Sequence, residues 1–165
     1  MLETLKERVC RANVTLVERG LVFQTWGNAS AIDREHYCIV IKPSGVPYDR
    51  MTPSDMSVVG LDGNSLEQGL KPSVDTAIHL ALYRAFPSIG GIVHTHSHYA
   101  TCFAQACVPI PCLGTTHADY FNGEIPVAPV LSEKDVAQDY EANIGKSIVA
   151  AYHARDPLEC PAALA

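Results

Sequence analysis

Short apolar segments of strand length, each ended by a turn, constrain the fold of this chain more than any other feature. Cys38 to Lys42 is apolar and β-branched, and Pro43-Ser44-Gly45 ends it. Ser57 to Leu61, the Asp62-Gly63 turn and Ser65 to Gln68 have the pattern of a hairpin. Because a hairpin joins antiparallel neighbours, we expect the sheet built from these segments to be largely antiparallel.

Helical periodicity surrounds these strands. Apolar residues recur at spacings of three and four from Leu2 to Leu16, which predicts a helix over residues 2–19 with Gly20 as its C-terminal cap. Pro72-Ser73 opens a second helix that runs to about Phe86, and Ser132 to Asp135 resembles a further helix start. Strands mixed with helices in one 165-residue chain predict a single α/β domain with a largely antiparallel central sheet flanked by helices.

Two further segments are predicted between these elements. Leu21 to Thr25 has the composition of a strand, and Trp26 to Ser30 that of a tight polar turn. Ile92 to Thr95 is a short apolar strand that follows Gly90-Gly91.

Charge and apolar content exclude several classes of partner. The net charge of −6 and the absence of a basic stripe argue against nucleic-acid binding. No apolar run approaches the roughly 20 residues that cross a bilayer, and the acidic, amphipathic N-terminus is unlike a signal peptide. None of the six cysteines forms a Cys-x-x-Cys pair, and several lie in apolar stretches as reduced thiols do. We therefore expect a cytoplasmic protein with no membrane partner.

His94-Thr95-His96 is the strongest chemical signal in the sequence. Residues i and i+2 of a strand point to the same face, so the two imidazoles are placed to share one metal ion, Zn²⁺ or another divalent metal. The alternative is a pair of solvated histidines at a strand end, and the motif alone leaves both interpretations open.

Two carboxylates are candidate partners of these histidines. Asp75 lies at the start of the second predicted helix, where it is either a metal ligand or base, or a residue that caps the helix and complements its dipole. Asp119 lies in the polar stretch Thr115 to Tyr120, as a general acid and base if it faces the metal, or as an ordinary loop residue. Its sequence context alone favours the ordinary loop residue.

Three short segments have the donors that an oxyanion needs. Gly27-Asn28 and Ser44-Gly45 are turns that present backbone N–H groups and short polar side chains, and Lys42 adds a charge beside the second. Ser73 lies at a helix N-terminus. Each segment alone is weak evidence for phosphate binding, because most such pairs are simply turns. None matches a P-loop or a dinucleotide fingerprint.

Taken together, these stretches resemble the class II aldolase family, whose branches include L-ribulose-5-phosphate 4-epimerase and L-fuculose-1-phosphate aldolase. Six motifs occur in family order, and they are Thr25-Trp26-Gly27-Asn28-Ala29-Ser30, Ile41-Lys42-Pro43-Ser44-Gly45-Val46, Met51-Thr52-Pro53-Ser54-Asp55-Met56, Lys71-Pro72-Ser73-Val74-Asp75-Thr76, Gly91-Ile92-Val93-His94-Thr95-His96-Ser97 and Gly114-Thr115-Thr116-His117-Ala118-Asp119-Tyr120-Phe121.

The resemblance implies a role for each candidate residue. His94 and His96 would be zinc ligands, and Asp75 would be the carboxylate at the metal. Asp119 would be the acid and base of the epimerase branch. The substrate phosphate would be held by Gly27, Asn28, Ser44, Gly45, Ser73 and Val74, with Lys42 nearby. An Asp rather than a Glu at position 75 places the chain nearer the epimerases than the aldolases.

The implied reaction is inversion of C4 of a pentulose 5-phosphate, L-ribulose 5-phosphate to D-xylulose 5-phosphate, by zinc-dependent retro-aldol and aldol chemistry. The alternatives are a class II sugar-phosphate aldolase of the L-fuculose-1-phosphate type, and a truncated, non-catalytic module with the aldolase fold. Retention of His94, His96 and Asp75 weighs against the non-enzymatic cytoskeletal head domains that share this fold. The implied partners are a small phosphorylated sugar and further copies of the chain in a homotetramer.

The sequence departs from the family pattern in two places. Val74 stands where the epimerases have a second Ser, so a hydroxyl is lost while the backbone N–H remains. Family members also continue past the position of Ala165, with a His-Gly-Pro-like segment that supplies a third metal ligand and with a catalytic Tyr. We therefore expect residues 1–165 to be one class II aldolase/epimerase domain that lacks its C-terminal part.

Overall fold

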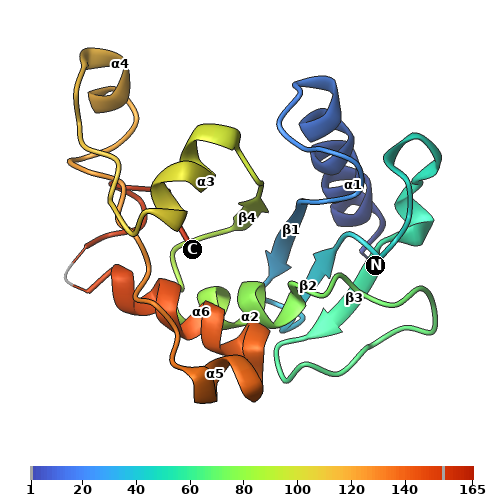
Figure 1. Cartoon of the computed structure of the whole chain (residues 1–165). Helices are drawn as coiled ribbons and strands as arrows, with labels where there is room; N and C mark the ends of the chain where they lie inside the picture. Colours follow the sequence, from blue (N-terminus) through green and yellow to red (C-terminus); the bar gives the residue numbers. More distant parts are fainter. Residues whose placement is uncertain (1, 154) are drawn as a thin grey trace. The chain divides into compact units, whose positions relative to one another are not determined.

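A computed structural model describes residues 2–153 and 155–165 (Figure 1). The chain forms two compact units. The first unit extends to Leu80 and includes Gly90–Ser97, and the second contains Ala81–Ile89 and His98–Ala165. All the candidate phosphate and metal residues lie in the first unit, whereas Asp119 lies in the second.

The first unit is built on a four-stranded antiparallel sheet with the strand order β3-β2-β1-β4. The strands are β1 (Asn28–Asp33), β2 (Cys38–Ile41), β3 (Ser57–Gly60) and β4 (Gly91–His94). The antiparallel arrangement expected from the hairpin pattern is thus confirmed. The expected second arm of the hairpin after β3 is reduced to a single bridge between Val59 and Ser65.

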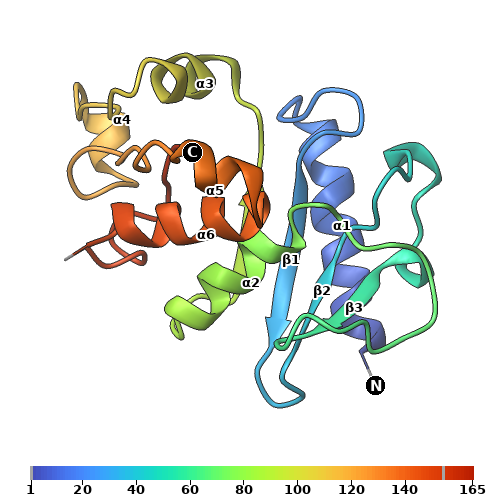
Figure 2. The same cartoon turned by 60° about the horizontal axis from the view of Figure 1, so that its bottom comes forward.

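Helix α1 (Glu3–Glu18) lies along one face of this sheet (Figure 2). It ends where the sequence predicts. Gly20 has φ +66°, and the Gly20 and Leu21 N–H groups donate to Val17 and Leu16 O in the Schellman pattern. Apolar residues from α1, β2 and β3, among them Val9, Val40 and Val58, form the core on this side.

Asn13 fastens α1 to β1 from a fully buried position. Its Nδ2 donates to Ala29 O at 3.0 Å and to Val9 O at 2.8 Å, and its Oδ1 accepts from Ala29 N at 2.8 Å. One side chain therefore satisfies both backbone groups of a buried strand residue.

Asn13→Ala should destabilise the fold by about 2–4 kcal/mol, because it leaves both Ala29 backbone groups buried and without this partner. Urea unfolding followed by circular dichroism measures the loss. Thr15→Ala is the matched control, since the exposed Thr15 hydroxyl bonds only within its own helix, and its cost should stay near 0.5 kcal/mol or below. Equal losses in the two variants would contradict the role of Asn13.

Strand β1 begins where the sequence predicted a turn. Leu21 to Thr25 is not a strand, because Gln24 has φ +53° and the chain turns there. The strand instead includes Asn28 and Ser30, whose side chains face away from α1 and bond to polar residues of the opposite face. These polar residues made the strand look like a turn in the sequence.

Helix α2 (Thr76–Ala85) starts on that opposite face, three residues later than predicted. Ser73 O accepts from Thr76 N and Thr76 Oγ1, which closes the first turn. Short 3-10 helices η1 (Tyr48–Arg50) and η2 (Pro53–Asp55) connect β2 to β3.

The second unit contains the end of α2 and four further helices among its described residues, which are α3 (His98–Gln105), α4 (Thr115–Ala118), α5 (Glu133–Ala137) and α6 (Tyr140–Ala151). The predicted helix start at Ser132 is confirmed, because Ser132 and Asp135 form a capping box at α5. Within residues 2–153 and 155–165, no helix combines the length and the apolar character that crossing a membrane requires.

Candidate metal and phosphate site

The register between β1 and β4 brings the first two site residues together. Asn28 lies directly opposite His94 in this antiparallel pair, and Ser30 lies opposite Ile92. Opposed residues project from the same face of the sheet, so Asn28 and His94 share the face on which α2 begins.

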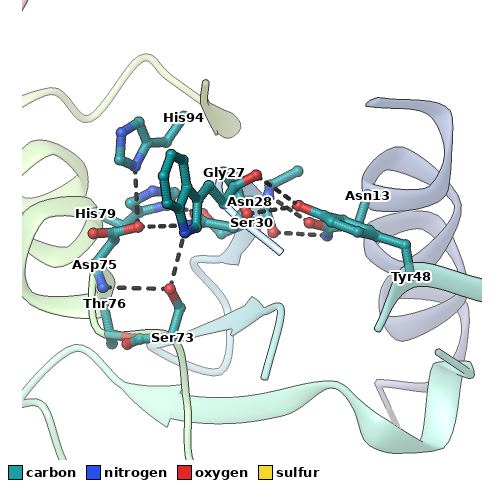
Figure 3. Close-up of polar contacts among 12 residues, drawn as sticks. Asn13, Gly27, Asn28, Ser30, Tyr48, Ser73, Asp75, Thr76, His79 and His94 are labelled. Atoms are coloured by element: carbon teal, nitrogen blue, oxygen red, sulfur yellow. Dashed lines mark hydrogen bonds and ion pairs between the residues drawn. The ribbon is translucent and has the colours of Figure 1, made fainter. Parts of the chain in front are cut away.

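Asp75 lies between these two side chains (Figure 3). Its Oδ2 accepts from Asn28 Nδ2 at 2.6 Å and is 3.0 Å from His94 Nδ1. Burial of Asp75 acts to raise its pKa, but the hydrogen bonds and charge of His94 and the amide of Asn28 outweigh it, so the pKa lies below its usual value. Asp75 is therefore an anion at neutral pH.

The charge on Asp75 fixes the tautomer of a neutral His94. An ionised carboxylate can only accept a hydrogen bond, so His94 Nδ1 must carry the proton that it shares with Asp75 Oδ2. His94 Nε2 then keeps its lone pair. A carboxylate that orients a histidine in this way is the usual second partner of a metal-binding imidazole.

His96 completes the aromatic wall of the site. Its ring centroid lies 4.9 Å from that of His94 and 5.8 Å from that of Trp26. His96 is exposed and His94 is half-buried. Among the described residues, no three His, Cys, Asp or Glu side chains are arranged to hold a metal ion together. The site has two adjacent imidazoles, and one of them is hydrogen-bonded to the Asp75 carboxylate.

Two extended segments form the other wall of the site. Pro43 and Pro72 pair as an antiparallel bridge, with Ser44 N donating to Lys71 O and Ser73 N donating to Lys42 O. The N–H groups of Gly45 and Val74 have no acceptor among the described residues. On this wall, these two N–H groups and the Ser44 and Ser73 hydroxyls are donors that an anion could use.

A pocket of about 330 Å³ joins the two walls. Its lining contains every residue that the sequence singled out for metal or phosphate, and the complete set is Thr25, Trp26, Gly27, Asn28, Lys42, Pro43, Ser44, Gly45, Ser73, Val74, Asp75, His94 and His96.

Lys42 brings a positive charge to this pocket from a buried position, with 3% of its surface exposed. Its Nζ donates to Pro43 O at 3.3 Å and lies 4.7 Å from the centre of the Tyr48 ring. No carboxylate in the described part of the chain pairs with it. Desolvation lowers the pKa of Lys42, and an anion in the pocket would offset that cost.

The sequence prediction missed His79, which supports Asp75 from one turn further along α2. Its Nδ1 lies 2.7 Å from Ser30 Oγ, so β1 is joined to the segment just before α2 through Asn28 and Asp75 and to the first turn of α2 through Ser30 and His79. Burial lowers the pKa of His79 to about 4, which keeps the ring neutral, and its Nε2 has no hydrogen-bond partner in the described part of the chain. The i, i+4 spacing of Asp75 and His79 places both on one side of the helix, and it is the signal that could have found His79 in the sequence.

Asp119 is exposed and follows the last residue of α4, where its N–H donates to Thr115 O. The acid and base role that the resemblance implies for it remains a prediction.

Comparison with known proteins places this chain in a family. The family described as Class II Aldolase and Adducin N-terminal domain matches residues 7–164. The chain belongs to this family. This match confirms the resemblance drawn from the six sequence motifs and the α/β fold class predicted from the mixture of strands and helices.

Named relatives fall on both branches. L-ribulose-5-phosphate 4-epimerase UlaF of Salmonella paratyphi C (strain RKS4594) is 54% identical over 160 residues, which are 97% of this chain and 70% of that protein. A solved L-fuculose 1-phosphate aldolase has a TM-score of 0.74 at 28% identity, over 87% of this chain and 68% of that one. The L-fuculose-1-phosphate aldolase of Thermus thermophilus has a TM-score of 0.67 at 25% identity, over 90% and 72%.

Proposed function

We propose that this chain is an enzyme of the L-ribulose-5-phosphate 4-epimerase type, which inverts C4 of a pentulose 5-phosphate through a bound divalent ion. The observation that carries the proposal is the pairing of two functions in one pocket. One wall presents an ionised Asp75 with two imidazoles, and the other presents Lys42 and unpaired backbone N–H groups. The 54% identity to an epimerase over most of the chain supports the choice of reaction.

The phosphate would anchor the sugar at the Lys42 wall. The N–H groups of Gly45 and Val74 and the hydroxyls of Ser44 and Ser73 are hydrogen-bond donors of the kind that oxyanions take. Lys42 would supply the charge. The carbon chain of the sugar would then extend toward His94 and His96 across the pocket.

The residues fit a divalent ion such as zinc in their chemistry. His94 offers an Nε2 lone pair because Asp75 holds the proton on Nδ1, and His96 lies beside it. When bound, such an ion supplies Lewis acidity that stabilises negative charge on the oxygens of a cleaving sugar. The role of Asp75 would be to keep the His94 tautomer and to add its own negative charge to the site.

Asp119 would take the proton from the C4 hydroxyl as the C3–C4 bond breaks, and it would return a proton when that bond re-forms. Asp119→Asn removes the titratable proton while keeping shape, so C4 inversion should fall at least about 100-fold. Asp139→Asn is the matched control, because Asp139 makes no capping hydrogen bond and Asn tolerates its left-handed backbone. Turnover by Asp119→Asn equal to that of Asp139→Asn would exclude the role.

An assay with L-ribulose 5-phosphate tests the reaction class. Carbon NMR of the zinc-supplemented chain should show D-xylulose 5-phosphate without accumulation of free dihydroxyacetone or glycolaldehyde phosphate, the two fragments of C3–C4 cleavage. Release of dihydroxyacetone phosphate from L-fuculose 1-phosphate would favour the aldolase, the activity named for the solved neighbours. Absence of both reactions would contradict the proposal.

A further inference from the structure

Tyr48 lies behind the pocket and contacts both parts of its phosphate side. Its hydroxyl donates to Gly27 O at 2.8 Å and lies 3.2 Å from Trp26 O (Figure 3). Its ring lies beneath the Lys42 ammonium at 4.7 Å. Tyr48 does not itself line the pocket, and its ring is buried in the core with Val9 and Val40.

The Tyr48 hydroxyl can only donate to these partners, because both are carbonyl oxygens. Burial raises the pKa of Tyr48 to about 12. The hydroxyl therefore keeps its proton across the physiological range.

The turn that this hydroxyl holds is closed by one backbone hydrogen bond, from Trp26 N to Phe23 O, and by the contact of the Phe23 and Trp26 rings. Phe23, Gln24, Thr25 and Trp26 are exposed, and the turn ends in Gly27, which has no side chain. The Trp26 ring nevertheless lines the pocket and contacts the His96 ring. Gly27 and Asn28 follow at once, so the position of the turn decides where three pocket residues lie.

The Tyr48 ring acts on Lys42 in a different way. A carboxylate in its place would neutralise the ammonium, whereas an aromatic face attracts the charge and leaves it uncompensated. This contact and the hydrogen bond to Pro43 O hold the buried Lys42 ammonium in place, and its charge remains available to an anion.

We propose that Tyr48 is a positioning residue that fixes the Trp26–Gly27 turn with its hydroxyl and the Lys42 ammonium with its ring, so that both meet one phosphate group. The inference rests on the proposed phosphate-binding function of the pocket. It assigns a role to a residue outside the pocket, and substitutions can remove the hydroxyl of Tyr48 separately from its ring.

Tyr48→Phe and Tyr48→Leu separate these halves in the full chain without added metal. Trp26 is the single tryptophan, so its emission and its quenching by acrylamide report the turn directly. Phosphorus NMR line broadening measures the affinity for inorganic phosphate at constant ionic strength. Tyr37→Phe is the matched control, because Tyr37 is 72% exposed and lies outside the pocket.

Tyr48→Phe should increase quenching of Trp26 and weaken phosphate binding about threefold to tenfold, the usual worth of one hydrogen bond. Tyr48→Leu should weaken it further, because Lys42 also loses the ring. Tyr37→Phe should leave both readouts unchanged. Circular dichroism establishes that each variant is folded, and Tyr48→Phe, which keeps the core ring, decides the inference if Tyr48→Leu unfolds.

Unchanged Trp26 quenching and phosphate affinity in Tyr48→Phe would overturn the inference. Failure of the unsubstituted chain to bind phosphate would instead contradict the proposed function, and the Trp26 readout would still decide whether Tyr48 holds the turn.

Discussion

His94→Ala is expected to weaken zinc binding by at least about 100-fold, because it removes a ligand and leaves Asp75 without the imidazole that it orients. Competition with a chromophoric chelator measures the affinity. Asp75→Asn should have a smaller effect, about 10-fold to 100-fold, since it keeps both imidazoles and loses the negative charge that fixes the His94 tautomer and adds to the site.

His36→Ala is the control for these two variants. His36 also pairs with an aspartate, at 2.9 Å from Asp33, but both residues lie outside the pocket. Its zinc affinity should equal that of the unsubstituted chain. If His94→Ala also retained that affinity, the strand-end histidines would not be the metal site.

Gly27→Ala is expected to weaken both zinc binding and phosphate binding in the pocket. Gly27 has φ +85°, and an added Cβ would lie 2.8 Å from His94 O and 2.7 Å from Val22 Cγ1. The strained backbone alone costs about 1–2 kcal/mol. Because the clash with His94 O is with backbone, the end of β4 that carries the proposed metal ligand His94 must also shift. We expect loss of about 2–4 kcal/mol of stability, with zinc and phosphate affinities both reduced.

Gly20→Ala isolates the strain from the clash. Gly20 has φ +66°, but nothing lies within 4 Å of an added Cβ. This variant should lose only about 1–2 kcal/mol in urea unfolding and should keep both affinities. Similar losses in the two variants would show that contact with His94 O is unimportant.

The parts of the site that were predictable from the sequence depend on local spacing. The spacing of His94 and His96 predicted that their rings lie together, and the rings are 4.9 Å apart although β4 ends at His94 and His96 lies beyond it. Lys42 follows an apolar strand that its own composition identifies. The six ordered motifs then identified the family, which one spacing alone does not do.

The parts that were not predictable depend on partners distant in sequence. Asn28 and Ser30 have turn-like composition, and in the strand Asn28 Nδ2 donates to Asp75 while the Ser30 hydroxyl bonds to His79. Nothing in the sequence around Tyr48 predicts its role, because that role arises from tertiary contacts with Gly27 and Lys42. The strand propensity of single residues predicts little where tertiary hydrogen bonds of this kind decide the structure.

X-ray absorption at the zinc edge of the chain loaded with one equivalent of zinc tests the proposed metal centre most directly. The six cysteines offer an alternative set of ligands, and sulfur scatters at about 2.3 Å whereas imidazole nitrogen scatters at about 2.0–2.1 Å. We predict a shell of nitrogen and oxygen with the multiple scattering of two imidazoles, reduced to one in His96→Ala. A shell dominated by sulfur, or one that His96→Ala leaves unchanged, would contradict the assignment of His94 and His96 as the metal ligands.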